Sequence, residues 1–257
     1  MTYKHRIYIG YDDREKVAYQ VLKYSIERHT KTPVEIIPLK HRELREQGLF
    51  KRPWLTEGET GIRIDLIDGK PFSTEFSHTR FLVPALQDYK GWALFIDADM
   101  LFLSDIKDLF SMVDDKYAVM VVKHMHEPKN AVKMDKQQQV QYGRKNWSSF
   151  IMFNCSHPAN KVLTPAYINF AKGRDMHQFS WLADYQIGHL GYEYNWIEGF
   201  SPNVTRPKVV HYTEGGPWFE GYQNVAFGEE WIADYERWQR EGNHSVFCEV
   251  PTIKYGG

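Results

Sequence analysis

Residues 95–101, Phe-Ile-Asp-Ala-Asp-Met-Leu, end an apolar run that begins at Trp92. This pattern predicts a buried strand, Trp92–Ile96, followed by the carboxylates of Asp97 and Asp99. Side chains at i and i+2 of an extended chain share one face, and two carboxylates that close repel unless a cation lies between them. Mg²⁺ and Mn²⁺ both accept such oxygens. The stretch therefore predicts a divalent metal site, and the alternative is a turn in which an aspartate caps a helix.

The residues before this stretch predict a parallel sheet. Residues 5–10 have the pattern of a buried strand, 15–28 that of an amphipathic helix, and 34–39 that of a second strand. A strand, helix and strand in this order favour a right-handed crossover and a largely parallel sheet. The expected class is α/β, and ligands of such sheets bind at the carboxyl ends of strands, where Asp97 and Asp99 lie.

The rest of the chain predicts shorter elements and a C-terminal extension. Residues 48–71 read as a loop or hairpin excursion, and 123–145 as a polar, mobile loop over an active site. An aromatic stripe within 228–240 predicts a packed helix. The other expected elements are helices at 76–86 (kinked or ended early at Pro84), 106–110, 160–170 (broken at Pro165) and 184–190, and strands at 118–122, 150–153 and 209–210.

A histidine and two glycines follow the last predicted strand, in the sequence His211-Tyr-Thr-Glu-Gly-Gly-Pro-Trp218. Histidine at a strand end can supply a neutral nitrogen ligand. Gly215 and Gly216 allow backbone N–H groups to approach a phosphate closely. His211 alone is more simply a core or surface histidine. Together with the glycines and the carboxylate pair, it predicts a third metal ligand beside a phosphate site.

Composition excludes several classes of partner. The net charge of −1 and the lack of a basic block give no electrostatic basis for nucleic-acid binding. No apolar stretch is long enough for a signal peptide or a transmembrane segment. The two cysteines, Cys155 and Cys248, are expected to be free thiols in a reducing compartment, which favours a cytoplasmic location.

These motifs resemble, in order and over most of the chain, the family 8 glycosyltransferases, which include glycogenin and bacterial lipopolysaccharide galactosyl- and glucosyltransferases. The resemblance implies a GT-A fold: one domain with a Rossmann-like, mostly parallel nucleotide-binding sheet and a helical, aromatic-rich C-terminal extension. It divides the chain into a donor-binding half (1–122), a sugar and acceptor half (123–226) and a helix with a tail (227–257). The residues that it assigns to the donor are Gly10, Tyr11, Asp12, Asp13, Arg80, Ala98, Ser148, Ser149, Gly215, Gly216 and Trp218.

The resemblance also implies an activity. A hexose would be transferred from a nucleotide-diphosphate sugar, with UDP as the expected nucleotide, and its anomeric configuration would be retained. Asp97, Asp99 and His211 would hold Mn²⁺ or Mg²⁺. The cation would neutralise charge on the leaving diphosphate, with Arg80 as a fixed donor. The acceptor, whether saccharide, lipid-linked or protein, is left open, and the loop 123–145 and the tail are its expected contacts.

Three departures from the family pattern limit these expectations. The phosphate loop is one residue shorter, and Gly216 stands where the family has a lysine, so the metal, Arg80, Arg206 or Lys208 must meet the diphosphate charge. Trp147 and Ser149 replace the Asn and Gly of the sugar-proximal strand. Residues 184–186, Asp-Tyr-Gln, replace Asp-Gln-Asp. Either Asp184 or Gln186 could face the reacting carbon, and Asp184 could instead be a helix N-cap.

Other functions are possible for an Asp-x-Asp pair after an apolar strand. A phosphatase of the haloacid-dehalogenase kind would need a later strand that ends in an acidic pair, which the sequence lacks. A nucleotidyltransferase would need a glycine-rich and basic loop after the first strand, where Asp12 and Asp13 stand instead. A catalytically silent nucleotide-sugar binding module has the same sequence features as the enzyme and stays open.

Overall fold

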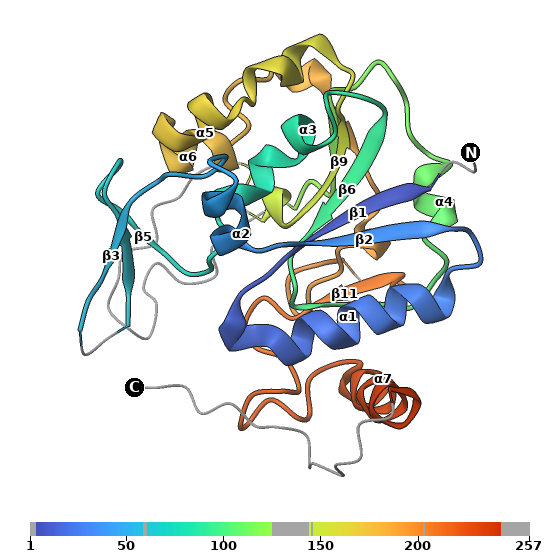
Figure 1. Ribbon diagram of the computed structural model, residues 1–257. Helices are drawn as coiled ribbons and strands as arrows, with labels where there is room; N and C mark the ends of the chain where they lie inside the picture. Colours follow the sequence, from blue (N-terminus) through green and yellow to red (C-terminus); the bar gives the residue numbers. More distant parts are fainter. Residues whose placement is uncertain (1–3, 59–60, 125–143, 145, 203, 243–257) are drawn as a thin grey trace.

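The computed structural model describes residues 4–58, 61–124, 144, 146–202 and 204–242, and its centre is a six-stranded sheet (Figure 1). The strand order is β10-β8-β9-β6-β1-β2. Strand β1 pairs in parallel with β2 and β6, β8 pairs in parallel with β10, and β9 runs antiparallel to β6 and β8. The bounds are β1 His5–Gly10, β2 Val34–Leu39, β6 Trp92–Ile96, β8 Val119–Val121, β9 Phe150–Asn154 and β10 Ile187–His189. The predicted α/β class with a mostly parallel sheet is confirmed.

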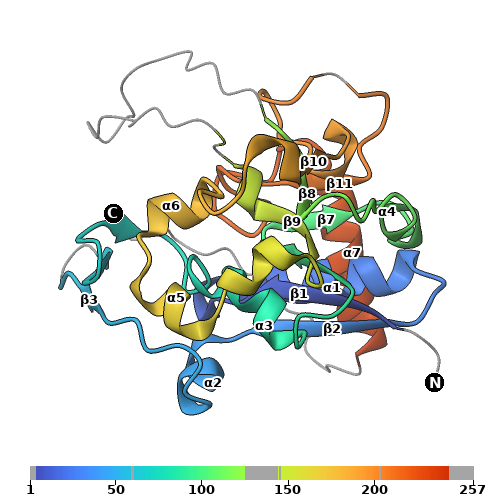
Figure 2. The ribbon, with the colours of Figure 1, turned by 90° about the horizontal axis from the view of Figure 1, so that it is seen from above.

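Each face of the sheet is covered by its own group of helices. Alternate residues of β6 point to opposite sides, so Phe95 packs into one apolar cluster and Leu94 into another. Helix α1 (Lys16–His29) covers the side of Leu94, while α3 (Val83–Leu86), α5 (Pro165–Phe170) and α6 (Gly173–His177) cover the side of Phe95. Figure 2 shows α3 and α5 in front of α1 and α7 in the view from above.

The C-terminal helix α7 (Gly228–Glu241) packs against α1 on the outside of the molecule (Figure 1). Trp231 is fully buried and Tyr235 nearly so, and their rings stack with centroids 5.7 Å apart. Trp231 also lies 5.3 Å from the ring of Trp218. The predicted aromatic stripe is therefore a packing surface.

The excursion predicted at 48–71 is a small antiparallel sheet of β3 (Trp54–Thr56), β4 (Arg63–Asp65) and β5 (Pro71–Phe72). Helix α2 (His41–Glu46) precedes it. The remaining described strands are β7 (Met100–Phe102) and β11 (Val209–His211), which pair with each other, and the remaining described α-helix is the one-turn α4 (Lys107–Phe110).

Two predicted helices differ in the structure. Pro84 does not kink its helix, because it lies in the first turn of α3, where the missing N–H costs nothing. A 3-10 turn, Thr79–Leu82, precedes it. The helix predicted at 184–190 is wrong: a 3-10 turn, Asp184–Gln186, leads into β10. Gly188 lies there with no room for a side chain, because Met120 and Tyr117 pack against it.

The other predictions agree with the described structure or lie outside it. The break at Pro165 is confirmed, since a 3-10 turn ends at Val162 and α5 begins at Pro165. Most of the loop predicted at 123–145, and the tail from 243, lie outside the described residues. No described helix has the length and apolar character that a membrane crossing requires. The three-part division of the chain stays a prediction.

Candidate metal centre

Asp97 and Asp99 lie between two strands, β6 and β7. Strand β6 ends at Ile96, and the N–H of Asp97 then donates to the carbonyl oxygen of Ser149, which leads into the neighbouring strand β9. Ala98 is fully buried between the two aspartates, whose side chains are 16 % and 22 % exposed. The chain bends at Ala98 and Asp99 rather than staying extended, and a ligand atom of each of the two carboxylates lies within 4.8 Å of the other.

His211 reaches this pair through strand pairing. It is the last residue of β11 and lies opposite Met100 of β7 in an antiparallel register. Its Nε2 is 3.3 Å from Oδ1 of Asp99, and one ligand atom from each of Asp97, Asp99 and His211 lies within 4.8 Å of the others. The three predicted ligands are thus brought together.

Arg80 closes one side of the centre. Its Nη1 lies 2.9 Å from Oδ1 of Asp97 and donates to the carbonyl oxygen of Ser148 at 2.7 Å. The guanidinium also lies over the rings of Phe76 and Phe95, at 5.4 and 4.9 Å. Arg80 is therefore a fixed cation beside Asp97, and its buried Nε has no hydrogen-bond partner among the described residues. Its contact with a donor stays a prediction.

Burial and the neighbouring charges shift the pKa values of all three residues of the centre. Burial raises the pKa of Asp97 to about 7, although Arg80 acts to lower it and Asp99 raises it further. Burial also acts to raise the pKa of Asp99, but His211 outweighs this and the pKa of Asp99 is lowered. For His211, burial acts to lower the pKa, but Asp99 outweighs it and the pKa is raised.

The donor set fits a divalent cation. The buried Oδ1 atoms of Asp97 and Asp99 accept no hydrogen bond from the described residues, although each has a neighbouring nitrogen at ion-pair distance. Two carboxylates and an imidazole suit Mn²⁺ well, and Mg²⁺ through the oxygens. Because unsatisfied buried acceptors are costly, their place in a group of residues with ligand atoms within 4.8 Å of one another favours a bound ion.

Glu15 is a residue that the sequence analysis missed. It ends the 3-10 turn after β1, and burial raises its pKa to about 8, with further contributions from Asp99 and Asp12. No hydrogen bond or ion pair to its carboxylate is present in the described part of the chain. The signal available in the sequence was its place four residues after Tyr11, in the charged segment Asp12-Asp13-Arg14-Glu15.

The segment predicted to bind the nucleoside lies beside the centre. Gly10 packs so closely on Phe76 that a Cβ would lie 2.3 Å from its ring. Tyr11 is half-buried, with the Lys40 ammonium 5.5 Å from its ring. Asp13 is exposed and pairs with Arg42 at 3.5 Å.

Asp12 is committed to the protein's own structure. Its buried carboxylate accepts hydrogen bonds from the backbone and guanidinium of Arg14, from Arg63 and from the N–H of Glu75. These contacts tie the end of β1 to the small sheet. A direct contact of Asp12 with a donor stays a prediction.

The two serines of the segment before β9 make internal hydrogen bonds. Ser148 Oγ lies 2.7 Å from Nδ1 of His177, and the carbonyl oxygen of Ser148 accepts a hydrogen bond from Arg80. Ser149 Oγ donates to the carbonyl oxygen of Asn146 and accepts from Asn195. Both therefore border the metal centre from the 3-10 turn Trp147–Ser149 that precedes β9, and their contact with a donor stays a prediction.

The predicted phosphate loop is tightly packed. Gly215 has a φ of 133°, and a Cβ on Gly216 would lie 2.0 Å from the ring of Trp218. Trp218 itself is fully buried against Tyr212 and Trp231, so its ring shapes the loop from inside. This burial disfavours the predicted direct contact of Trp218 with the donor. Of the alternative bases, Lys208 donates to Tyr194 Oη at 2.9 Å.

Asp184 and Gln186 are not joined to the metal centre by any hydrogen bond or ion pair among the described residues. The side chain of Asp184 is 91 % exposed and pairs with Arg144. The Oε1 atom of Gln186 accepts from the N–H of Ala183 at 3.0 Å and closes their own turn. Their roles at the reacting carbon stay predictions.

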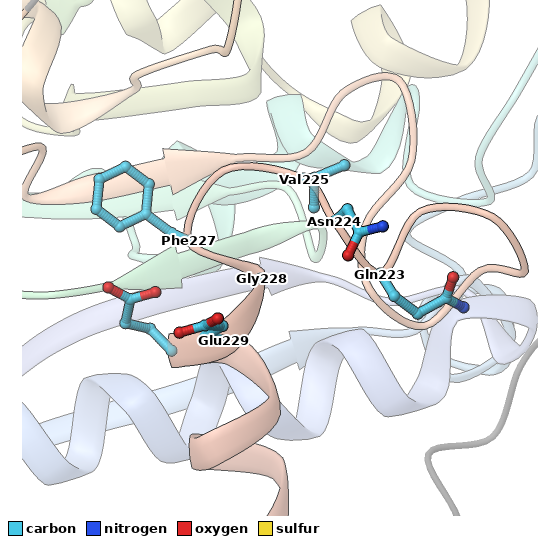
Figure 3. A pocket seen from close by; sticks show the side chains of 7 residues that line it. Gln223, Asn224, Val225, Phe227, Gly228 and Glu229 are labelled. Carbon is cyan, nitrogen blue, oxygen red and sulfur yellow. The ribbon is translucent and has the colours of Figure 1, made fainter.

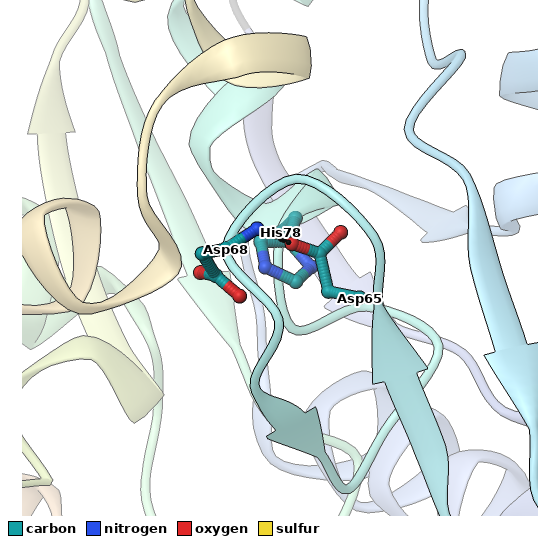
Figure 4. A group of neighbouring side chains, drawn as sticks. All are labelled: Asp65, Asp68 and His78. Carbon is teal, nitrogen blue, oxygen red and sulfur yellow. Dashed lines mark hydrogen bonds between the residues drawn. The ribbon is translucent and has the colours of Figure 1, made fainter.

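A second group of acidic and histidine residues has a structural role (Figure 4). Asp65, Asp68 and His78 lie close enough for a shared ion, but the fully buried guanidinium of Arg52 occupies the group. It donates to both oxygens of Asp65 at 2.7 Å, and to the carbonyl oxygens of Ile168 and Ala171. This network, called the Arg52 clasp below, fastens the small sheet to α5 and the start of α6.

A shallow pocket at the start of α7 contains none of the predicted site residues (Figure 3). Its volume is about 320 Å³, and it is lined by Gln223, Asn224, Val225, Phe227, Gly228, Glu229 and Glu230. Its charged side chains are two glutamates at the start of a helix, and no hydrogen-bond donors of the lining converge on one point. The pocket therefore indicates no particular ligand.

Comparison with known proteins identifies one close relative. Protein CDI of Arabidopsis thaliana is 44 % identical over 241 residues, which cover 92 % of this chain and 88 % of that protein. No family model matches the chain.

Solved structures with the same fold are glycosyltransferases. The bifunctional glycosyltransferase WbbM superposes with a TM-score of 0.60 and 18 % identity, covering 93 % of this chain and 51 % of that one. GlyE of Streptococcus pneumoniae TIGR4 gives 0.58 and 15 %, covering 93 % and 62 %. The galactosyltransferase LgtC, solved with donor and acceptor sugar analogs, gives 0.55 and 11 %, covering 90 % and 95 %. This chain thus spans roughly half to two thirds of the WbbM and GlyE chains but nearly all of LgtC. Identities this low establish the shared fold alone.

Proposed function

Because the chain belongs to the family of Protein CDI and has the GT-A fold of the family 8-like glycosyltransferases, we propose that it is a metal-dependent hexosyltransferase. Its donor would be a nucleotide-diphosphate sugar with UDP as the nucleotide. The proposal includes retention of anomeric configuration and leaves the acceptor open. It also includes a cytoplasmic location, supported by the free, buried thiol of Cys155.

One observation carries the proposal. Asp97, Asp99 and His211 come from two distant parts of the chain, and the pairing of β7 with β11 brings their ligand atoms within 4.8 Å of one another. Asp97 and Asp99 also each have a buried Oδ1 atom that no hydrogen bond from the described residues satisfies. A packed interior rarely leaves such acceptors unsatisfied unless a ligand completes them.

These three residues would hold the cation against the donor's diphosphate. When bound, the cation would supply Lewis-acid stabilisation of the leaving nucleoside diphosphate. Arg80 would add a second positive charge, because its guanidinium is held rigidly by Ser148 and two aromatic rings. A donor that is already in place costs no reorganisation when charge develops. Asp184 or Gln186 remains the proposed partner of the sugar.

Two alternatives make different predictions. A silent binding module would bind nucleoside diphosphate with metal but release none from a sugar donor. A phosphatase would need a second acidic pair for its cation, and the second acidic group among the described residues is neutralised by Arg52. The observations therefore favour the transferase over the phosphatase.

The experiment is a panel of nucleotide sugars incubated with the protein and Mn²⁺, in which nucleoside diphosphate and inorganic phosphate are both quantified. The proposal expects nucleoside diphosphate from at least one donor, with loss on chelation and in D99N. D114N is the matched control, because Asp114 is a partly exposed aspartate that pairs with Lys116. Diphosphate binding without release from any donor would support the silent module, and phosphate release from simple esters would support the phosphatase.

A further inference from the structure

Asn195 is a buried amide that joins His211 to Ser149. It follows the 3-10 turn Tyr192–Tyr194, and none of its surface is exposed. Its Oδ1 lies 2.9 Å from Nδ1 of His211, and its Nδ2 donates to Oγ of Ser149 at 3.0 Å. The other imidazole nitrogen, Nε2, faces Asp99. Asn195 therefore contacts the ring on the side away from the proposed cation.

The hydroxyl of Ser149 sets the direction of these hydrogen bonds. Its Oγ donates to the carbonyl oxygen of Asn146 at 2.8 Å. A hydroxyl carries one proton, so Ser149 can only accept from Asn195. Asn195 must then turn its NH₂ toward Ser149 and its carbonyl oxygen toward His211. That oxygen has no proton to give, so Nδ1 of His211 is the donor.

We infer that Asn195, held by Ser149, is a positioning residue that fixes His211 in the tautomer with its proton on Nδ1, so that Nε2 presents its lone pair to a divalent cation beside Asp99. This inference rests on the proposed function, because that function places a cation there. Metal-binding histidines commonly donate their second N–H to an oxygen acceptor, which fixes both the tautomer and the ring orientation.

The chemistry of the amide suits this position. Asp97 and Asp99 already bring two carboxylates to the centre, and their negative charges contribute to raising the pKa of Glu15. A neutral acceptor orients the imidazole without adding another negative charge. The inference also gives Ser149 a defined role, because its hydroxyl is engaged with Asn146 and Asn195 and acts on His211 through the amide.

The first test reads the tautomer directly in the metal-free protein. Long-range ¹H–¹⁵N spectra of ¹⁵N-histidine-labelled protein, recorded at alkaline pH, distinguish a protonated Nδ1 from a protonated Nε2. The H211Q variant identifies the His211 signals. We expect the proton on Nδ1 in the wild type and in N195D, which keeps an acceptor at this place. In N195L, which has no acceptor, we expect a mixed or reversed tautomer.

The second test measures Mn²⁺ affinity by calorimetry. We expect N195L to bind Mn²⁺ about 10- to 100-fold more weakly than the wild type, and N195D to stay within about threefold. N169L is the matched control, because Asn169 is also a buried amide but bonds to Leu49, Lys51 and Pro165 around α5. We expect its Mn²⁺ affinity to be unchanged.

The outcomes separate this inference from the proposed function. A wild-type protein that binds no Mn²⁺ would contradict the proposed function, while the tautomer measurement would still decide the role of Asn195. A wild-type proton on Nε2, or an unchanged tautomer and Mn²⁺ affinity in N195L, would overturn the inference. If N195L fails to fold, S149A decides instead: it should shift the tautomer and weaken Mn²⁺ binding several-fold, and unchanged values for both would overturn the inference.

Discussion

Nε2 of His211 lies 3.3 Å from Oδ1 of Asp99, because His211 stands opposite Met100 in the pairing of β11 with β7. The N–H of Tyr212 also donates to the carbonyl oxygen of Asp99 at 2.9 Å, which fixes this register. A shift of one residue would turn His211 to the other face of its strand. The candidate metal centre is thus a consequence of strand register as much as of residue identity.

Loss of His211 should weaken metal-dependent nucleotide binding. We expect H211A to bind nucleoside diphosphate in the presence of Mn²⁺ at least about tenfold more weakly, a loss of about 1.4 kcal/mol. Binding without metal should be equal to that of the wild type. Calorimetric titrations with and without Mn²⁺ measure both. H189Q, at an exposed histidine on β10, is the control, and equal Mn²⁺-dependent affinities in H211A and H189Q would contradict the prediction.

Replacement of Arg80 should make the protein more dependent on metal for stability. Arg80 is the neighbouring cation of Asp97, so R80M leaves a largely buried carboxylate uncompensated. Breaking such a pair typically costs about 3–5 kcal/mol. Because Mn²⁺ would restore the charge balance, we expect it to raise the melting temperature of R80M more than that of the wild type. Equal increases in a thermal-unfolding titration would show that the cation does not compensate Asp97.

Replacement of Arg52 should destabilise the protein without making its stability more dependent on metal. The guanidinium of Arg52 is fully buried and donates to Asp65 at two positions, so R52M should lower the free energy of unfolding by about 3–5 kcal/mol. The clasp lies apart from the proposed cation, and Mn²⁺ should therefore stabilise R52M and the wild type equally. Urea unfolding with and without Mn²⁺ tests this. A selective rescue of R52M by Mn²⁺ would instead identify the group of Asp65, Asp68 and His78 as a metal site.

Buried His78 should make the protein less stable in acid. Burial, followed by the nearby charge of Arg52, lowers its pKa to about 3, against an ordinary value of 6.5. The unfolded chain binds the proton more readily, so this contribution to stability is present above pH 6.5 and is lost as the pH falls toward 3. The loss from one histidine is about 1.4 kcal/mol per pH unit.

Urea unfolding between pH 7 and pH 4.5 measures this dependence, and H78Q removes the titrating group. We expect the unfolding free energy of H78Q to fall less steeply with decreasing pH than that of the wild type. Other buried histidines, such as His124 and His177, contribute equally to both proteins and cancel in the difference. Parallel pH profiles would mean that His78 takes up no proton on unfolding.

Local patterns predicted the strands and the ligands of the site. Each of these features can be recognised from a few neighbouring residues: the apolar run before Asp97, the i and i+2 spacing of Asp97 and Asp99, and the position of His211 at the end of a strand. The helix predicted at 184–190 was wrong because β10 has only three residues, too few to show a period of two. The conformation of β10 depends on its pairing with β8. Gly188 fits there because Met120 and Tyr117 leave no room for a side chain.

The remaining features of the site depend on tertiary contacts. Asn195 stands in a stretch without a motif, and only the fold brings its amide between His211 and Ser149. Asp12 forms hydrogen bonds with Arg63 and with the N–H of Glu75, which lie far away in the sequence. No local pattern indicates that these segments are neighbours. Trp218 looks like a ligand contact in the sequence and is fully buried in the structure, because burial is decided by α7 packing over it.

The most direct measurement of the central claim is anomalous diffraction from crystals grown with Mn²⁺ and a nucleoside diphosphate. The account predicts one strong manganese peak between Asp97, Asp99 and His211, with the diphosphate oxygens completing its coordination. Bound nucleotide with no manganese between these three residues, or manganese between Asp65, Asp68 and His78 instead, would contradict it.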